Sequence, residues 1–106
     1  MKWIEIGALE SVPRLGARIV RGAGGDIAIF RNGEDEVFAL DDRCPHRGGP
    51  LSQGIVHGMR VTCPLHNFVI ELETGKAVAP DEGCTHVHQV KVEAGKIYLA
   101  SPASGP

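Results

Sequence analysis

The side chains best suited to chemistry in this sequence are two thiols and two imidazoles, which are grouped in two short segments. The first segment pairs Cys44 with His46, and the second pairs Cys63 with His66. A proline directly follows each cysteine, and sixteen residues separate the two segments. Because thiolate and imidazole are metal ligands, two such segments facing each other could hold a metal centre between them.

Two kinds of metal centre use two cysteines and two histidines. A structural zinc ion takes such a set, but zinc sites usually pair ligands of one type on each loop. A [2Fe–2S] cluster needs a mixture, because two cysteines can hold one iron while two histidines hold the other. The mixed pairs therefore favour a [2Fe–2S] cluster held by Cys44, His46, Cys63 and His66, and zinc is the alternative.

The net charge of such a cluster predicts how readily it accepts an electron. Two ferric ions, two sulfides and two thiolates sum to a neutral oxidised core, whereas an all-cysteine core is a dianion. Adding an electron to a neutral core is easier, so histidine ligation raises the reduction potential. Protein and sulfide fill every iron position, so the centre passes single electrons and binds no substrate at iron. We therefore predict an electron carrier without catalytic residues.

Short apolar segments between glycine-rich turns must position these ligands. Six of them are predicted strands because β-branched or alternating residues fill them, at residues 27–30, 36–40, 60–63, 68–72, 90–93 and 96–99. The last two flank Ala94-Gly95, a two-residue hairpin loop. Helical periodicity is absent apart from a short turn expected at residues 9–14. An all-β sandwich or small barrel follows, with the ligand segments in loops.

Composition narrows the class of protein. A chain of 106 residues fits one domain, and its formal net charge of −2 gives no electrostatic reason to bind nucleic acid or an anionic membrane. The sequence has no apolar run long enough for a signal peptide or a membrane helix. Three cysteines is an odd count, which favours metal chemistry over disulfides. We expect a cytoplasmic protein whose tail, residues 101–106, is frayed.

The ligand pattern resembles the Rieske family. Residues 44–54 (Cys-Pro-His-Arg-Gly-Gly-Pro-Leu-Ser-Gln-Gly) and 63–68 (Cys-Pro-Leu-His-Asn-Phe) carry this resemblance. It implies an antiparallel β-sandwich over residues 1–106, in which two ligand loops form a cluster-binding subdomain at about residues 43–68. A third loop, expected at residues 79–81, would cover the cluster, and partners would dock at the tip.

The sequence departs from the high-potential Rieske proteins of respiratory complexes. Those proteins carry a disulfide and two hydroxyl donors at positions that match Gly49, Leu65, Phe68 and Ile70 here. Fewer hydrogen bonds to the cluster leave its added electron less stabilised. We therefore expect a reduction potential near the low end of the Rieske range, about −150 mV.

Within the family, the chain resembles the small subunit of assimilatory NAD(P)H-dependent nitrite reductase. The segments that carry this likeness are residues 54–58, 72–77 and 80–84. The resemblance implies a large partner subunit with FAD, a second iron–sulfur centre and siroheme, which reduces nitrite to ammonium. The alternatives are a free Rieske-type ferredoxin that supplies an aromatic-ring-hydroxylating oxygenase, and a zinc-bound interaction module.

Other polar residues near the ligand segments have weaker roles. His57 is expected as a solvated turn residue, His86 and His88 as partly buried packing residues, and Cys84 as a plain buried cysteine. Alternative positions are the docking face for His57 and the neighbourhood of the cluster for Cys84. Three arginines flank the ligand loops and are solvated charge or steer an acidic partner: Arg43, Arg47 and Arg60.

Overall fold

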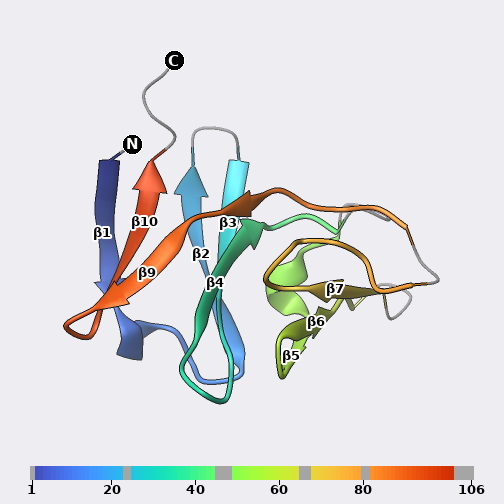
Figure 1. Ribbon diagram of the computed structural model, residues 1–106, viewed down its shortest axis with the longest axis horizontal. Coiled ribbons are helices and arrows are strands. Elements are labelled where there is room, and N and C mark those ends of the chain that lie inside the picture. The colour runs from blue at the N-terminus through green and yellow to red at the C-terminus, as the bar shows by residue number, and fades with distance from the viewer. Residues whose placement is uncertain (1, 23–24, 45–48, 65–67, 80–81, 102–106) are drawn as a thin grey trace.

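The computed structural model describes residues 2–22, 25–44, 49–64, 68–79 and 82–101. Its strands form three antiparallel sheets (Figure 1). The first sheet has the order β1 (Lys2–Ala8), β10 (Lys96–Ser101), β9 (Val90–Glu93). The second has the order β2 (Gly16–Gly22), β3 (Gly25–Arg31), β4 (Val37–Asp41), β8 (Val87–His88). The third has the order β5 (Ile55–His57), β6 (Arg60–Thr62), β7 (Val69–Glu71), and two short 3-10 helices, η1 (Leu9–Ser11) and η2 (Leu51–Gln53), lie in connections.

The second sheet lies in the middle, and its strand β3 is buried on both faces. Along β3, burial is continuous from Ile27 to Arg31, while successive side chains point to opposite faces. Ile29 belongs to one buried cluster, and Phe30 belongs to the other. A strand buried on both faces needs an unbroken apolar run rather than an alternating one, which the Ile-Ala-Ile-Phe sequence supplies.

Each buried cluster joins the middle sheet to one neighbouring layer. On one face, Ile29 and Ala39 pack with Ile97 and Leu99 of β10, which completes a β-sandwich. On the other face, the middle sheet packs against the ligand-loop body, which consists of η2, the third sheet and the segments that begin at Cys44 and Cys63. The residues of this second cluster are Ala28, Phe30, Leu40, Cys44, Leu51, Val56, Val61, Cys63, Phe68, Ile70 and Leu72. The middle sheet is therefore the wall that the sandwich and the ligand-loop body share (Figure 1).

Two tight turns set the register of their hairpins. Ala94 and Gly95 have φ of 52° and 75°, the left-handed pair that a type I′ turn requires, and they pair Glu93 with Lys96. Gly58 has φ of 61° and is the first of the two residues between β5 and β6. Both turns keep the right-handed twist of the strands that they join.

The all-β, antiparallel fold predicted from the sequence is confirmed, and so are the six predicted strands and the hairpin loop at Ala94-Gly95. The expected helical turn is η1. Four strands, β1, β2, β5 and β8, were not predicted. Ser101 still pairs with Lys2 at the end of β10, so the strand extends into the expected tail, whose residues 102–106 lie outside the described part. Within the described residues, no helix is long and apolar enough to cross a membrane.

Candidate metal centre

The predicted ligands lie in two loops, and a backbone hydrogen bond joins the two ends of each loop in the same way. The first runs from Cys44 to Gly49 after β4, and the second runs from Cys63 to Phe68 between β6 and β7. The Cys44 N–H donates to the Gly49 carbonyl oxygen at 2.7 Å, and the Cys63 N–H donates to the Phe68 carbonyl oxygen at 2.6 Å. Each cysteine thus bonds to the residue five positions ahead. The sequence pattern of one cysteine and one histidine per segment corresponds to two loops closed in the same way.

The two cysteines lie in the same apolar core. Cys44 is 1% exposed and Cys63 is 0% exposed, and both belong to the cluster that includes Leu51, Val61 and Ile70. A thiolate in such surroundings is costly unless a cation neutralises it. A [2Fe–2S] core and a zinc ion both become neutral with two thiolates. The burial of this donor set therefore fits a metal centre of either kind.

The two histidines of the predicted ligand set, His46 and His66, lie outside the described residues, as do Pro80 and Asp81 of the expected third loop. Among the described residues, no group of three or more histidines, cysteines and carboxylates is placed to hold a metal ion. The ligand set Cys44, His46, Cys63 and His66 therefore remains a prediction.

Two positions at which the resemblance to high-potential Rieske proteins would place hydroxyl donors are apolar and buried. Phe68 is 6% exposed and Ile70 is 0% exposed, and both pack in the core beneath the second loop. Neither side chain can donate a hydrogen bond. This surrounding is consistent with the low reduction potential expected from the sequence.

Two adjacent aspartates connect the first ligand loop to the rest of the fold. The Asp42 carboxylate accepts hydrogen bonds from the Ser52 N–H at 2.7 Å and the Ser52 hydroxyl at 2.9 Å. The Asp41 carboxylate oxygen lies 2.7 Å from Nε2 of His88 on β8. These contacts were not predicted, although Asp and Ser commonly use their side chains to bond nearby backbone. The signal in the sequence was a pair of aspartates just before Cys44.

The segment after the expected third loop returns to the middle sheet beside Asp41. The Asp41 N–H donates to the His86 carbonyl oxygen at 3.0 Å. The rings of His86 and His88 meet edge to face, with centroids 4.6 Å apart. The partly buried position predicted for His88 is confirmed, whereas that predicted for His86 is wrong, because its side chain is exposed where the chain runs over the surface before β8 begins.

The prediction that Cys84 is buried is also wrong. Its side chain is exposed, and its neighbours Glu82 and Gly83 are exposed as well. The physical reason is that Cys84 lies outside the strands and pairs with Lys76 through an isolated bridge. His57 is exposed as expected, but it ends β5 instead of lying in the turn, and its Nε2 lies 2.7 Å from the Thr62 hydroxyl.

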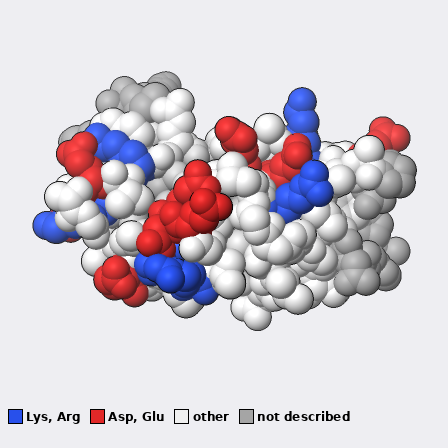
Figure 2. Space-filling model, turned by 60° about the horizontal axis from the view of Figure 1, so that its bottom comes forward, with Lys and Arg blue, Asp and Glu red and all other residues white. Residues whose placement is uncertain are grey.

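The arginines that flank the loops are solvated where the structure describes them. Arg43 is exposed, and half of the Arg60 side chain is exposed, with its guanidinium 3.9 Å from Glu71. Arg47 lies outside the described residues. Figure 2 shows acidic and basic side chains next to one another on the face that it presents. On that face, therefore, charge alone does not select a partner of one sign.

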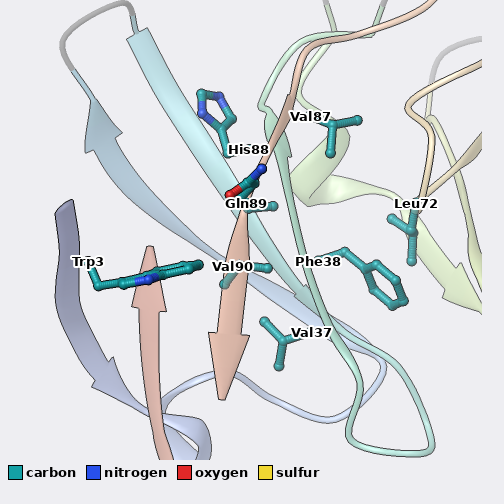
Figure 3. Close-up of a pocket in the computed structure, with 9 residues that line it drawn as sticks. Trp3, Val37, Phe38, Leu72, Val87, His88, Gln89 and Val90 are labelled. Carbon is teal, nitrogen blue, oxygen red and sulfur yellow. The ribbon is translucent and has the colours of Figure 1, made fainter. Parts of the chain in front are cut away.

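A groove of about 420 Å³ is lined mainly by residues of the first and second sheets, together with Leu72, which follows β7 (Figure 3). It is lined by Trp3, Val37, Phe38, Ala39, Leu72, Val87, His88, Gln89 and Val90. Neither buried cysteine belongs to this lining, so the groove is separate from the candidate metal centre.

Comparison with known proteins supplies the family. The model of the Rieske [2Fe–2S] domain matches residues 2–89. The ferredoxin subunit of the 3-phenylpropionate/cinnamic acid dioxygenase from Photorhabdus laumondii is 37% identical over 101 residues, which cover 93% of this chain and 94% of that protein. The 4β-methylsterol monooxygenase of Methylococcus capsulatus is 39% identical over 77 residues, or 73% of this chain, but the match spans only 18% of that enzyme.

Solved structures agree with this fold. The carbazole 1,9a-dioxygenase complex of reduced oxygenase and oxidised ferredoxin contains a chain with a TM-score of 0.79 and 28% identity, and the alignment covers 92% of this chain and all of that one. A protein assigned as the NADH-dependent nitrite reductase small subunit of Mycobacterium tuberculosis has a TM-score of 0.84 at 23% identity, with 96% of both chains covered. The chain therefore belongs to the Rieske [2Fe–2S] domain family and is an electron carrier built around a [2Fe–2S] cluster.

Proposed function

We propose that Cys44, His46, Cys63 and His66 hold the [2Fe–2S] cluster, and that the chain is the small subunit of an assimilatory NAD(P)H nitrite reductase. In this role it carries single electrons within an enzyme that reduces nitrite to ammonium. The large subunit would supply FAD, a second iron–sulfur centre and siroheme. The chain itself has no catalytic residue and works in the cytoplasm.

The matching closure of the two loops carries the ligand assignment. Cys44 and Cys63 each bond through their own N–H to the carbonyl oxygen five residues ahead. Each closure therefore spans one histidine, at position 46 or 66, and both cysteines belong to one buried cluster. Two loops of this kind on a shared core supply equivalent halves of a ligand set, as a centre with one iron for each ligand type requires.

The residues around the cysteines determine how the centre behaves. When bound, the cluster supplies a one-electron couple. Leu51 and Ile70 are fully buried in the cluster that contains both cysteines, so they keep water away from the sulfur atoms. With apolar side chains at Phe68 and Ile70, few donors stabilise the reduced state. The chain therefore suits a carrier with a potential of about −150 mV.

The likeness to nitrite reductase small subunits rests on three segments, whose described parts are connected in the structure. The Leu72 N–H donates to the Met59 carbonyl oxygen at 2.9 Å, which ties residues 72–77 to the β5–β6 hairpin, whose first strand and turn include residues 55–58. Lys76 and Cys84 form an isolated bridge, which ties residues 72–77 to residues 80–84. The described parts of the three segments are thus connected through the backbone, which supports a shared contact region for one partner.

A free ferredoxin that supplies an aromatic-ring-hydroxylating oxygenase is the second candidate. Identity favours it: the dioxygenase ferredoxin subunit of Photorhabdus laumondii is 37% identical and of nearly equal length. The ferredoxin in the carbazole dioxygenase complex is 28% identical. The nitrite reductase likeness among solved structures supports the fold only. The two candidates share the cluster and its ligands and differ in the partner.

The ligand assignment is tested by anaerobic reconstitution followed by iron and sulfide analysis and low-temperature EPR. The wild-type chain should contain about two irons and two sulfides, and the reduced centre should have a mean g value below that of an all-cysteine cluster. Cys44→Ser and His66→Asn should lose this signal. The matched controls Cys84→Ser and His86→Asn should keep it, because both residues are exposed and distant in sequence from the loops. A colourless chain containing zinc would refute the assignment.

The partner is tested with the large subunit of the nitrite reductase and with a ring-hydroxylating oxygenase from the same organism. The proposal predicts that the chain co-purifies with the siroheme subunit and that the complex reduces nitrite with NAD(P)H. Single-turnover reoxidation of the prereduced chain measures electron transfer to each partner directly. Fast reoxidation by the oxygenase, with no binding to the siroheme subunit, would favour the second candidate instead.

A further inference from the structure

Asp42 has a role that neither the ligand pattern nor the family match assigns. Its backbone N–H donates to the Asp26 carbonyl oxygen on β3 at 2.9 Å, which fixes Asp42 to the middle sheet. Its carboxylate accepts two hydrogen bonds from Ser52, one from the N–H at 2.7 Å and one from the hydroxyl at 2.9 Å. Asp42 lies two residues before Cys44, and Ser52 lies three residues after Gly49. The bonds therefore join the two ends of the segment that contains the first ligand loop.

Ser52, which donates these bonds to Asp42, lies next to the core that contains the cysteines. Ser52 lies in η2, directly after Leu51, which is 0% exposed and belongs to the buried cluster of Cys44 and Cys63. Within the loop, the Cys44 N–H bonds to the Gly49 carbonyl oxygen. An inner closure from Cys44 to Gly49 is thus enclosed by an outer closure from Asp42 to Ser52. Both bonds to the carboxylate are charge-assisted, which makes them stronger than bonds between neutral groups.

We propose that Asp42 is a positioning residue for the [2Fe–2S] cluster: by clamping Ser52 it holds the first ligand loop in the geometry that the cluster needs. The inference rests on the proposed ligand role of the Cys44 loop and is independent of the electron-transfer partner. In this role Asp42 acts through its bonds to Ser52 and not as a ligand. Partners outside the ligand shell that fix its geometry commonly change metal affinity 10- to 100-fold when they are mutated.

The test compares cluster loss and EPR spectra in loaded protein. Asp42→Ala removes both acceptors, so the visible absorbance of the oxidised cluster should decay about 10- to 100-fold faster under an iron chelator, with a shifted or broadened EPR signal after reduction. Ser52→Ala removes only the hydroxyl bond and should have an intermediate rate. Asp42→Asn retains an acceptor for the Ser52 N–H, so this variant should lose its cluster at a rate close to that of the wild-type protein. Asp26→Ala is the control, because Asp26 contacts Asp42 through its backbone carbonyl.

Two results would overturn the clamp while leaving the proposed function intact. One is an Asp42→Ala protein that loses its cluster at the wild-type rate with an unchanged EPR signal. The other is an Asp42→Asn protein as impaired as Asp42→Ala, since negative charge rather than bonding to Ser52 would then be responsible. Failure of the wild-type chain to load a cluster would instead refute the ligand assignment, and the clamp with it. Melting curves of the variants show whether the fold itself has changed.

Discussion

Gly75 and Gly95 are a matched pair of glycines for measuring how tightly the turn after β7 is packed. Their φ angles are 74° and 75°, both in the left-handed region. A Cβ added at Gly75 would press on the Thr85 carbonyl oxygen and lie 2.8 Å from Cγ2 of Val87, whereas a Cβ at Gly95 would meet nothing within 4 Å. Alanine substitutions at the two positions therefore share backbone strain and differ in crowding.

The magnitudes follow from these two contributions. The left-handed conformation costs alanine about 1–2 kcal/mol. Replacing glycine also restricts the unfolded chain, which offsets about 0.4–1 kcal/mol of that cost. We expect Gly95→Ala to lower the free energy of unfolding by about 0.5–1 kcal/mol. Crowding at Gly75 adds about 1–3 kcal/mol, because the neighbour is backbone and because Gly75 also accepts a 2.8 Å hydrogen bond from the Thr85 N–H.

Thermal unfolding of the loaded, oxidised protein, followed by far-UV circular dichroism, measures the difference. For a domain of this size, about 1 kcal/mol shifts the melting temperature by about 4–8 °C. Gly75→Ala should therefore melt roughly 4–24 °C below Gly95→Ala. Equal melting temperatures would show that the segment at Thr85 yields freely, and the reasoning from close packing would be refuted.

Three further substitutions test other parts of the fold. Ala94→Asn should stabilise the β9–β10 hairpin by about 0.5–1 kcal/mol in urea unfolding, because Asn-Gly suits a type I′ turn better than Ala-Gly; a lower midpoint would contradict this turn type. Ile70→Ala should cost about 2–5 kcal/mol, since it leaves a cavity in the core beneath both cysteines, and an unchanged midpoint would mean that the core collapses to fill it. The side-chain hydrogen bond from Arg31, assisted by Arg14, lowers the pKa of Asp35 below 3.8. This carboxylate stabilises the fold above its unfolded pKa and loses that contribution as pH falls through the folded value. Asp35→Asn should therefore flatten the loss of thermal stability on acidification, and an identical pH profile would count against the ion pair.

The sequence predicted the parts of this fold that depend on local patterns. Residues 27–30 and 96–99 are apolar runs that become strands, and Ala94-Gly95 is a turn by its own backbone preference. The strand β2 could not be predicted in the same way. Its residues are half-buried or exposed and include charged side chains, so the strand exists because β3 offers it a hydrogen-bonding edge. Pairing with a neighbouring strand overrides weak local preference.

In the candidate site, too, local sequence patterns could be predicted, whereas contacts between separate segments could not. The types and spacing of Cys44 and Cys63 indicated metal chemistry, and the structure brings both into one buried cluster. The exposure of Cys84 depends on what covers a segment, which composition does not encode. The bonds that Ser52 donates to Asp42 join residues ten positions apart, with the first ligand segment between them. Such contacts are properties of the folded chain.

The middle sheet explains how a small chain can hold a redox centre rigidly. Electron transfer is efficient when the surroundings of the centre are already arranged and need not reorganise as charge changes. Here the first loop follows β4 of that sheet, the second loop joins β6 and β7, and both pack through one core onto β3 and β4. The opposite face of the same sheet is packed against β10 by a separate core. A displacement of Cys44 or Cys63 must therefore disturb strands that are packed on both faces, which ties the positions of these two cysteines to the stability of the domain.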